Sequence, residues 1–230
     1  MKSFVVSLVG ATVITLVVPQ SSLAQYYNSY HGGAGPYSYV GIGPAFTEDG
    51  KVREFTGFTA GNKIRYDTGF ALEVAVGYAF NDWVSVELEA GWIGSEIQSV
   101  QGFTHDDTFL YNAPFLASVT LQHRIPQTII TPYVRAAVGG SATVFDTDGF
   151  SNGTITLFGY DSDLVFAYQF SAGVRFDLND QMSIGVGYKY FATEDSSFEY
   201  GSFSGGGPVV RLGIEGVRTH VVTVSFNMKF

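Results

Sequence analysis

The segment Phe70–Trp92, FALEVAVGYAFNDWVSVELEAGW, decides the fold. Large apolar side chains alternate with small or acidic ones before the pair Asn81-Asp82, and the alternation resumes after it. Successive side chains of a β-strand point to opposite faces, so a period of two predicts two strands, each with one apolar and one small or polar face. Asn and Asp favour a tight turn between strands. The segment therefore predicts an antiparallel hairpin.

The same alternation recurs along the chain, in runs of about ten residues, which is the length expected of tilted membrane-spanning strands. In most runs, large apolar residues lie on one face, and small or polar residues lie on the other. The eight predicted strands are Tyr37–Phe46, Gly69–Phe80, Trp83–Ser95, Leu110–Arg124, Pro132–Val144, Asp163–Leu178, Met182–Ala192 and His220–Phe230.

The connections between these strands alternate in length. Three are short, namely Asn81-Asp82, Ile125–Thr131 and Asn179-Asp180, and four are long, polar and glycine-rich, namely 47–68, 96–109, 145–162 and 193–217. Short periplasmic turns on one rim and long outer loops on the other are typical of outer-membrane barrels. The sequence predicts an all-β fold, an eight-stranded antiparallel up-and-down transmembrane β-barrel of residues 37–230 with both termini in the periplasm.

Composition separates this fold from a soluble barrel or sandwich. The chain is 46% hydrophobic and 16% aromatic but only 14% charged, against about 25% charged in globular domains. A soluble alternative would turn its large apolar face inward. In a bilayer each unpaired backbone group costs several kcal/mol, so a spanning sheet must close on itself. We therefore expect the apolar face to contact lipid and the small, polar face to line a lumen.

The predicted lumen face carries charged residues of both signs. Four acids and five bases can pair across the narrow interior of an eight-stranded barrel, which has room only for side chains. We interpret them as a salt-bridged plug, because buried charges need partners; an ion pathway or proton relay is the alternative. The predicted lumen network is Glu73, Glu87, Glu89, Arg124, Arg135, Arg175, Asp177, Lys189 and Lys229.

The amino terminus has the pattern of an export signal. Lys2 precedes the apolar run Phe4–Val18, and a small-residue site ends at Ala24, so residues 1–24 are predicted to be a signal peptide cleaved before Gln25. An uncleaved anchor is the alternative, although the run is short for a membrane span. Residues 25–36, rich in glycine and tyrosine, are predicted to be a flexible N-terminal segment.

Other chemistry is excluded or disfavoured by residue content. The chain has no cysteine, which excludes a disulfide framework, a thiolate metal site and lipid attachment to an N-terminal cysteine. The formal net charge of −9 argues against nucleic acid as a partner. The four histidines lie outside any serine-hydrolase motif, so we expect no enzyme and no cofactor. They are His31, His105, His123 and His220.

Acidic residues gather in the long connections. DTDG at Asp146, DSD at Asp161 and HDD at His105 hold carboxylates of the type that binds Ca²⁺, but the EF-hand spacing is absent. We expect solvated acidic loops without a metal site. Weak divalent-cation bridging from these loops to lipopolysaccharide phosphates is the alternative.

Five segments together resemble the small outer-membrane β-barrel family of the OmpA/OmpX and opacity-protein type. The resemblance covers about residues 37–230 and implies a monomer in a Gram-negative-type outer membrane, in contact with its lipid and lipopolysaccharide. Unlike OmpA, the chain has no peptidoglycan-binding domain after the barrel, so peptidoglycan anchoring is not expected. The segments are FALEVAVGYAFNDWVSVELEAGW from Phe70, YVGIGPAF from Tyr39, PYVRAAVGGSA from Pro132, FSAGVRFDLNDQMSIGVGYKY from Phe170 and VTVSFNMKF from Val222.

The resemblance also implies how the barrel is assembled and what it does. A terminal aromatic residue after alternating apolar ones implies a signal read by the barrel assembly machinery, here Val224, Phe226, Met228 and Phe230. Function varies within such families. We expect a non-enzymatic structural or adhesin-like role in which the long loops contact an extracellular ligand. The alternative is a porin-like channel for ions or small solutes.

Overall fold

The computed structural model describes residues 34–56, 58–200 and 210–230, without the side chains of residues 58–60. The predicted signal peptide, its cleavage site and residues 25–33 of the N-terminal segment lie outside the described residues. Gly35 and Pro36, at the end of that segment, already belong to the first strand. No helix in the described part of the chain is long and apolar enough to cross a membrane.

Every strand of the described residues pairs with its neighbours in antiparallel fashion. The strands are β1 (Gly35–Thr47), β2 (Gly50–Phe55), β3 (Phe58–Tyr66), β4 (Gly69–Ala79), β5 (Val84–Val100), β6 (Thr104–Gln122), β7 (Ile130–Ser151), β8 (Thr156–Asp177), β9 (Met182–Thr193), β10 (Ser196–Tyr200), β11 (Val210–Ile214) and β12 (Arg218–Lys229).

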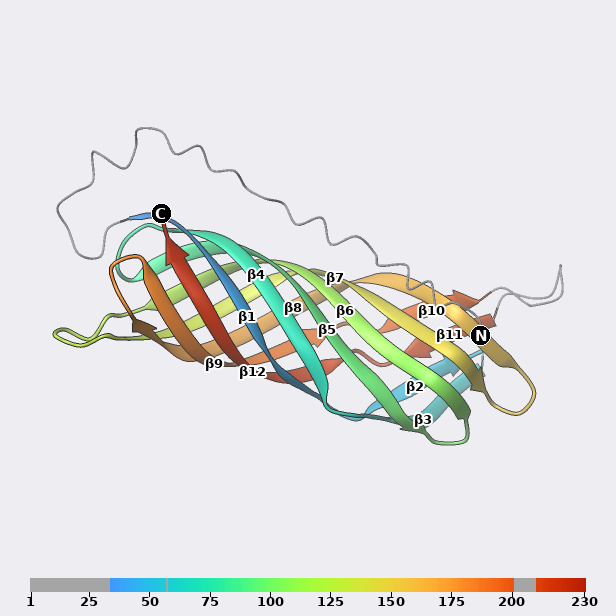
Figure 1. Cartoon of the computed structure of the whole chain (residues 1–230). Coiled ribbons are helices and arrows are strands. Elements are labelled where there is room, and N and C mark those ends of the chain that lie inside the picture. The colour runs from blue at the N-terminus through green and yellow to red at the C-terminus, as the bar shows by residue number, and fades with distance from the viewer. Residues whose placement is uncertain (1–33, 57, 201–209) are drawn as a thin grey trace, which may run out of the picture. The chain divides into compact units, whose positions relative to one another are not determined.

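Eight of these strands close into a ring (Figure 1). Its order is β1, β4, β5, β6, β7, β8, β9 and β12, and β12 returns to β1 with Lys229 opposite Tyr37. Each predicted strand lies within or overlaps one strand of this ring. The predicted eight-stranded antiparallel barrel is confirmed. We call the end with the three short connections the turn end.

The four long connections differ from the prediction, because most of their residues are in strands. Strands β5, β6, β7 and β8 continue well beyond the predicted barrel limits, and β2, β3, β10 and β11 occupy the other two connections. These strands form a second sheet arrangement in the order β8, β7, β6, β5, β3, β2, β11 and β10, which we call the extension. The extension lies at the end opposite the turn end (Figure 1).

Carboxylates join the first and last strands of the extension. Asp163 Oδ2 of β8 accepts a hydrogen bond from the backbone N–H of Ser197 at 2.8 Å, and Asp161 Oδ2 accepts one from Glu199 at 2.6 Å. No backbone ladder between β8 and β10 is present in the described residues. The two carboxylates of the DSD motif therefore take part in the wall of the extension, where they satisfy edge N–H groups that a strand would otherwise pair.

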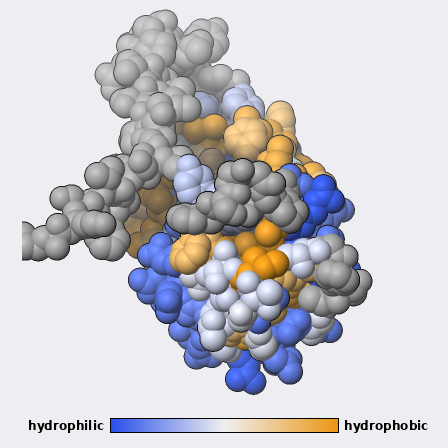
Figure 2. Space-filling model, turned by 90° about the vertical axis from the view of Figure 1, so that its right-hand side faces the viewer, coloured by the Kyte–Doolittle hydropathy of each residue, from blue (hydrophilic) through white to orange (hydrophobic). Residues whose placement is uncertain are grey.

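The extension encloses an apolar core. Its largest fully buried members include Phe145, Phe150 and Phe198, and several aromatic rings meet edge to face. Seen from the extension end, hydrophilic residues surround a smaller group of hydrophobic ones (Figure 2). The core consists of Val52, Phe55, Ile64, Ile97, Val100, Leu110, Phe145, Phe150, Leu157, Phe198, Tyr200, Val210, Leu212, Ile214 and Val217.

The barrel has the opposite arrangement. Its outer surface exposes apolar side chains such as Val74, Phe115 and Val138, at 49%, 63% and 56%. Soluble proteins rarely expose a contiguous apolar surface of this kind, whereas a lipid-facing band is made of it. The barrel interior is lined by small, polar and charged residues. This interior is where the predicted lumen residues lie.

Candidate functional site

Six of the nine predicted lumen residues are buried in the barrel interior. They come from five strands whose inward-facing positions converge on the axis, and each is less than 9% exposed: Glu73, Glu87, Glu89, Arg135, Arg175 and Lys189. The other three, Arg124, Asp177 and Lys229, lie at the turn end, where the Arg124 side chain is 48% exposed.

Arg135 of β7 is the centre of the buried network. Its Nε lies 2.7 Å from Glu87 Oε2 and 3.6 Å from Glu89 Oε1. Its nitrogens also donate to Thr120 Oγ1 at 3.0 Å and to the Tyr39 hydroxyl at 2.5 Å. The strand pairing explains part of this geometry, because Thr120 lies directly opposite Arg135 on the neighbouring strand. Charge and hydrogen bonds together compensate the burial of this guanidinium.

Glu87 of β5 accepts hydrogen bonds from several groups besides Arg135. Ser118 Oγ and Thr120 Oγ1 donate to its two oxygens at 3.1 and 3.0 Å. The Tyr37 hydroxyl also donates to it and lies 2.8 Å from Ser85 Oγ. A carboxylate with this many donors is fixed in place, which makes it part of the packing of the interior.

A second group lies farther from the turn end. Lys189 Nζ of β9 forms an ion pair with Glu73 of β4. Glu89 Oε2 accepts from Gln169 Nε2 at 3.0 Å. A Cβ atom added to Gly41 would come within 2.5 Å of Glu73 Oε1, so the glycine provides the space in which this carboxylate lies. The lumen therefore alternates small residues with charged ones because each charge needs room.

The turn end holds a looser set of charges. Asp177 Oδ2 lies 3.5 Å from Arg124 Nε and accepts from Thr131 Oγ1 at 3.1 Å. Lys229 pairs in register with Tyr37 at the same end. Arg175 has no ion pair or hydrogen bond with any described residue; its guanidinium carbon lies 5.5 Å from the centre of the Tyr133 ring.

Sequence reasoning missed the aromatic and amide members of this interior. Tyr37, Tyr39, Tyr133 and Gln169 all take part in it. A strand-parity signal was present for Tyr37 and Tyr39, which share their parity with Gly41 of the lumen face. Aromatic rings are also common on the lipid-facing surface of such barrels, so parity alone does not assign a tyrosine to the lumen.

The interior leaves little space. The cavity bordered by Glu73, Glu89, Gln169 and Lys189 has a volume of about 10 Å³, which is room for about one water molecule. The described residues contain no group of three or more His, Asp or Glu side chains that could hold a metal ion. Packed and paired, the network can brace the wall of the barrel and obstruct passage through it.

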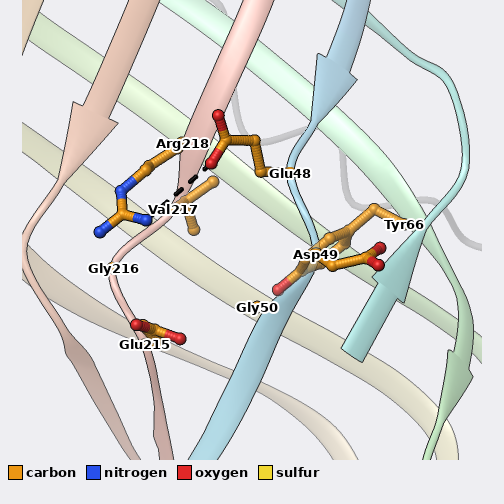
Figure 3. A pocket seen from close by; sticks show the side chains of 8 residues that line it. All are labelled: Glu48, Asp49, Gly50, Tyr66, Glu215, Gly216, Val217 and Arg218. Atoms are coloured by element: carbon orange, nitrogen blue, oxygen red, sulfur yellow. Dashed lines mark ion pairs between the residues drawn. The ribbon is translucent and has the colours of Figure 1, made fainter. Parts of the chain in front are cut away.

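A second small pocket lies where the barrel meets the extension (Figure 3). It also has a volume of about 10 Å³, and its lining includes Glu48, Tyr66, Glu215 and Arg218. Arg218 and Glu48 form a loose ion pair at 3.9 Å. Burial raises the pKa of the Tyr66 hydroxyl, and the negative charges of Glu215 and Asp49 raise it further. The pocket is too small for a substrate.

The three histidines among the described residues do not assemble a site. His220 Nε2 lies 2.8 Å from Glu48 Oε1, and its Nδ1 lies 2.5 Å from the Tyr188 hydroxyl. The His123 ring stacks on Trp83 with 4.1 Å between ring centres. His105 lies in the extension part of β6, and His31 lies outside the described residues.

Comparison with known proteins places this architecture in a family. The model of the family described as outer membrane protein beta-barrel domain matches residues 11–230. The chain belongs to this family. As a member of the outer-membrane β-barrel family, the protein lies in the outer membrane of a Gram-negative-type cell. A comparison with curated proteins finds no match.

Solved structures of the family's fold are similar to the chain. OprG of Pseudomonas aeruginosa is 16% identical with a TM-score of 0.61, covering 88% of this chain and 99% of OprG. Neisserial surface protein A is 17% identical with a TM-score of 0.51, covering 86% and 99%. The protease OmpT of Escherichia coli is 7% identical with a TM-score of 0.50, covering 85% and 96%. At these identities the similarity shows the fold alone.

Proposed function

We propose that the protein is a non-enzymatic outer-membrane barrel with a structural or adhesin-like role, exercised through the extension. The observation that carries this proposal is the filled interior. Paired charges occupy the barrel, and aromatic side chains occupy the extension. A filled interior favours contact at the surface over passage through the lumen. Function then resides on the outside of a rigid scaffold.

The proposed orientation puts the turn end and both termini in the periplasm and the extension outside the cell. The short connections at one rim and the long ones at the other support this orientation. In it, the apolar outer band contacts membrane lipid and the inner part of lipopolysaccharide. The barrel assembly machinery is the proposed reader of Val224, Phe226, Met228 and Phe230, of which Phe226 and Phe230 are exposed at 40% and 57%.

The surface role is tested by changing the extension while leaving the barrel intact. One variant replaces the β2–β3 hairpin, residues 50–66, with a short turn, and another substitutes exposed residues of β10 and β11. We expect cells that display these variants to bind other cells or extracellular matrix less well. The control is heat-modifiable migration in SDS gels, which reports a closed barrel. Undiminished binding by every folded variant would contradict the proposed role.

The channel alternative is tested in planar bilayers. The buried charges of the lumen are the observation that favours a channel, since an ion pathway also needs them. A plugged barrel gives no steady conductance, with or without Glu87→Gln or Arg135→Gln. Steady conductance that changes when either residue is neutralised would replace the surface role with transport.

The assembly signal has a test of its own. Deleting Phe230 is expected to reduce insertion by the assembly machinery in cells, while barrel refolded in detergent keeps nearly normal stability. The comparison of cellular insertion with refolded stability separates recognition from packing. Normal insertion of the truncated chain would remove Phe230 from the signal.

A further inference from the structure

The two buried arginines of the lumen differ in their partners. Arg135 has two carboxylates, a hydroxyl group of threonine and one of tyrosine within reach. Arg175 is equally buried, at 8% exposure, yet it forms no ion pair and no hydrogen bond with the described residues. A buried charge without a partner is strongly unfavourable. The question is therefore which group compensates the buried positive charge of Arg175.

The nearest acid on the same strand is already engaged. Asp177 follows Arg175 by two positions on β8, so it faces the same side. Its Oδ2 contacts Arg124 and Thr131 instead. The terminal carboxylate of Phe230 forms no ion pair with Arg175 either. The guanidinium carbon lies 5.5 Å from the centre of the Tyr133 ring. Glu87 attracts it through space, but within the described residues no acid comes within ion-pair distance of it.

Other cations surround the same region. Arg175 and Arg124 both repel the ammonium group of Lys229, while Asp177 and Asp82 attract it. Three cations thus gather at the turn end of a chain whose formal net charge is −9. Like charges held close together repel one another, so a further anion between Arg175 and Lys229 would be stabilising. We call Arg175, Lys229 and Arg124 the cationic mouth.

The position of Arg175 suits it to bind an incoming group. Among the described residues, the fully buried side-chain atoms without a hydrogen-bond partner are Glu89 Oε1, Gln122 Oε1 and Ser141 Oγ, and no Arg175 nitrogen is among them. The guanidinium nitrogens, which form no hydrogen bond with the described residues, therefore keep some accessible surface. The Tyr133 ring lies over the neighbouring strands β8 and β9, where two glycines make room for it, since a Cβ on Gly173 or Gly187 would meet its hydroxyl within 2.7 Å. The ring limits how far the guanidinium can swing.

We propose that the cationic mouth binds an oxyanion, a phosphate or carboxylate group, with Arg175 as its principal ligand. Arginine holds such groups through two parallel N–H···O bonds. Lys229 contributes a second positive charge, and Arg124 stays with Asp177 at the rim. This proposal concerns the turn end and goes beyond the surface role proposed for the extension.

The phosphate group could come from a free solute or from a lipid headgroup, and the experiment separates them. The ¹⁵N-labelled full chain is refolded in a maltoside detergent, which carries no phosphate, and titrated with inorganic phosphate while arginine Nε–H signals are followed by NMR. In parallel, the chain is placed in nanodiscs of zwitterionic lipid with or without phosphatidylglycerol and no free phosphate. A saturable shift in the first arm indicates a solute; one only in the second indicates a lipid.

Variants then assign the site. We expect Arg175→Gln to weaken phosphate or lipid binding at least about tenfold, which is roughly 1.4 kcal/mol, and Lys229→Gln to weaken it less. Arg175→Lys keeps the charge but loses the fork, so its affinity should lie between those of wild type and Arg175→Gln. The matched control is Arg65→Gln, which removes an exposed arginine from β3 of the extension.

The outcome that overturns the proposal is equally specific. No saturable shift of Arg175 in either arm, or equal binding by wild type and folded Arg175→Gln, would show that the mouth is not an anion site. If Arg175→Gln fails to migrate as a closed barrel, Arg175→Lys and Lys229→Gln carry the test. Loss of surface binding by extension variants would leave this result unchanged, so the two proposals fail separately.

Discussion

The interiors of the barrel and the extension are opposite in character, although the two regions share the four strands β5, β6, β7 and β8. On β7 the inward-facing positions keep one parity while their chemistry changes, from Arg135 in the barrel to Phe145 in the extension. The outward positions change in the other direction, from Val138 to Asp146. A layer of hydroxyl and amide side chains separates the two, where Thr143 Oγ1 donates to Asn112 Oδ1 at 2.9 Å.

The difference shows that surroundings decide which face of a strand is apolar. Where the outer face meets lipid, apolar side chains gain no free energy by turning inward, and charged side chains lie in the lumen instead. Where the outer face meets water, the hydrophobic effect drives aromatic side chains into the interior. The change from one arrangement to the other marks where the lipid-facing wall ends, on the side of the extension. Substitutions that respect or violate this limit can test it.

The largest effect is expected in the barrel interior. Arg135→Met leaves Glu87 and Glu89 buried without their cation, which should cost about 3–5 kcal/mol. The measurement is reversible urea unfolding in lipid vesicles. Adding Glu87→Gln to the variant should recover part of the loss, because it removes one unpaired charge. Equal stability of wild type and Arg135→Met would mean that the network does not brace the barrel.

A comparable loss, confined to the other region, is expected from Phe145→Ala. Phe145 is fully buried among Phe150, Phe198 and Tyr200, and removing a buried aromatic side chain costs about 3–5 kcal/mol. The extension should become sensitive to protease while the barrel keeps its unboiled mobility. The control is Phe115→Ala on the lipid-facing surface, which leaves no cavity. Loss of the closed barrel in Phe145→Ala would show that the two interiors fold as one unit.

The sequence was sufficient for the barrel and not for the extension, for a physical reason. Alternation over Phe70–Phe80 is strict, so strand, face and turn follow from it. In the extension, register shifts between Thr147 and Phe150 and between Val52 and Glu54 break the period of two. Strands β10 and β11 have only five residues each, too few for a pattern. Glycine and acidic residues then gave these segments the composition of loops.

For the candidate site, the sequence predicts which residues face the lumen but not which of them form pairs. Parity alone puts Glu87 and Arg135 on the face of small and polar residues. Which acid meets which base depends on the stagger of the closed ring, and that stagger is a property of strands distant in sequence. Hence the structure was required to show that Arg135 pairs with Glu87 and that Arg175 forms no ion pair within the described residues.

A smaller effect tests the limit between lipid and water directly. Val138→Arg puts a cation on the lipid-facing wall and should destabilise the inserted barrel by about 2–4 kcal/mol. Asp146→Arg introduces the same arginine on the same strand and the same face, but in the extension. This variant should be nearly neutral. Burial and the neighbouring Asp148 raise the pKa of Asp146, so losing this carboxylate relieves a mild repulsion. Equal destabilisation by both variants would place Asp146 within the lipid-facing wall.

The smallest effect concerns the boundary between β8 and β10, where the extension depends on carboxylates in place of a backbone ladder. Asp163→Ala removes the acceptor of the Ser197 N–H bond, and a lost charge-assisted hydrogen bond at an exposed site should cost about 1 kcal/mol. Hydrogen exchange should accelerate at Ser197 and remain unchanged at strands of the barrel ring. Ser162→Ala, which changes an exposed neighbour, is the control. In Asp163→Ala the Glu199 N–H still donates to Asp161, so adding Asp161→Ala should open the boundary more than either single substitution does. If hydrogen exchange is unchanged in both single variants and in the double variant, the strands of the extension are joined by other contacts.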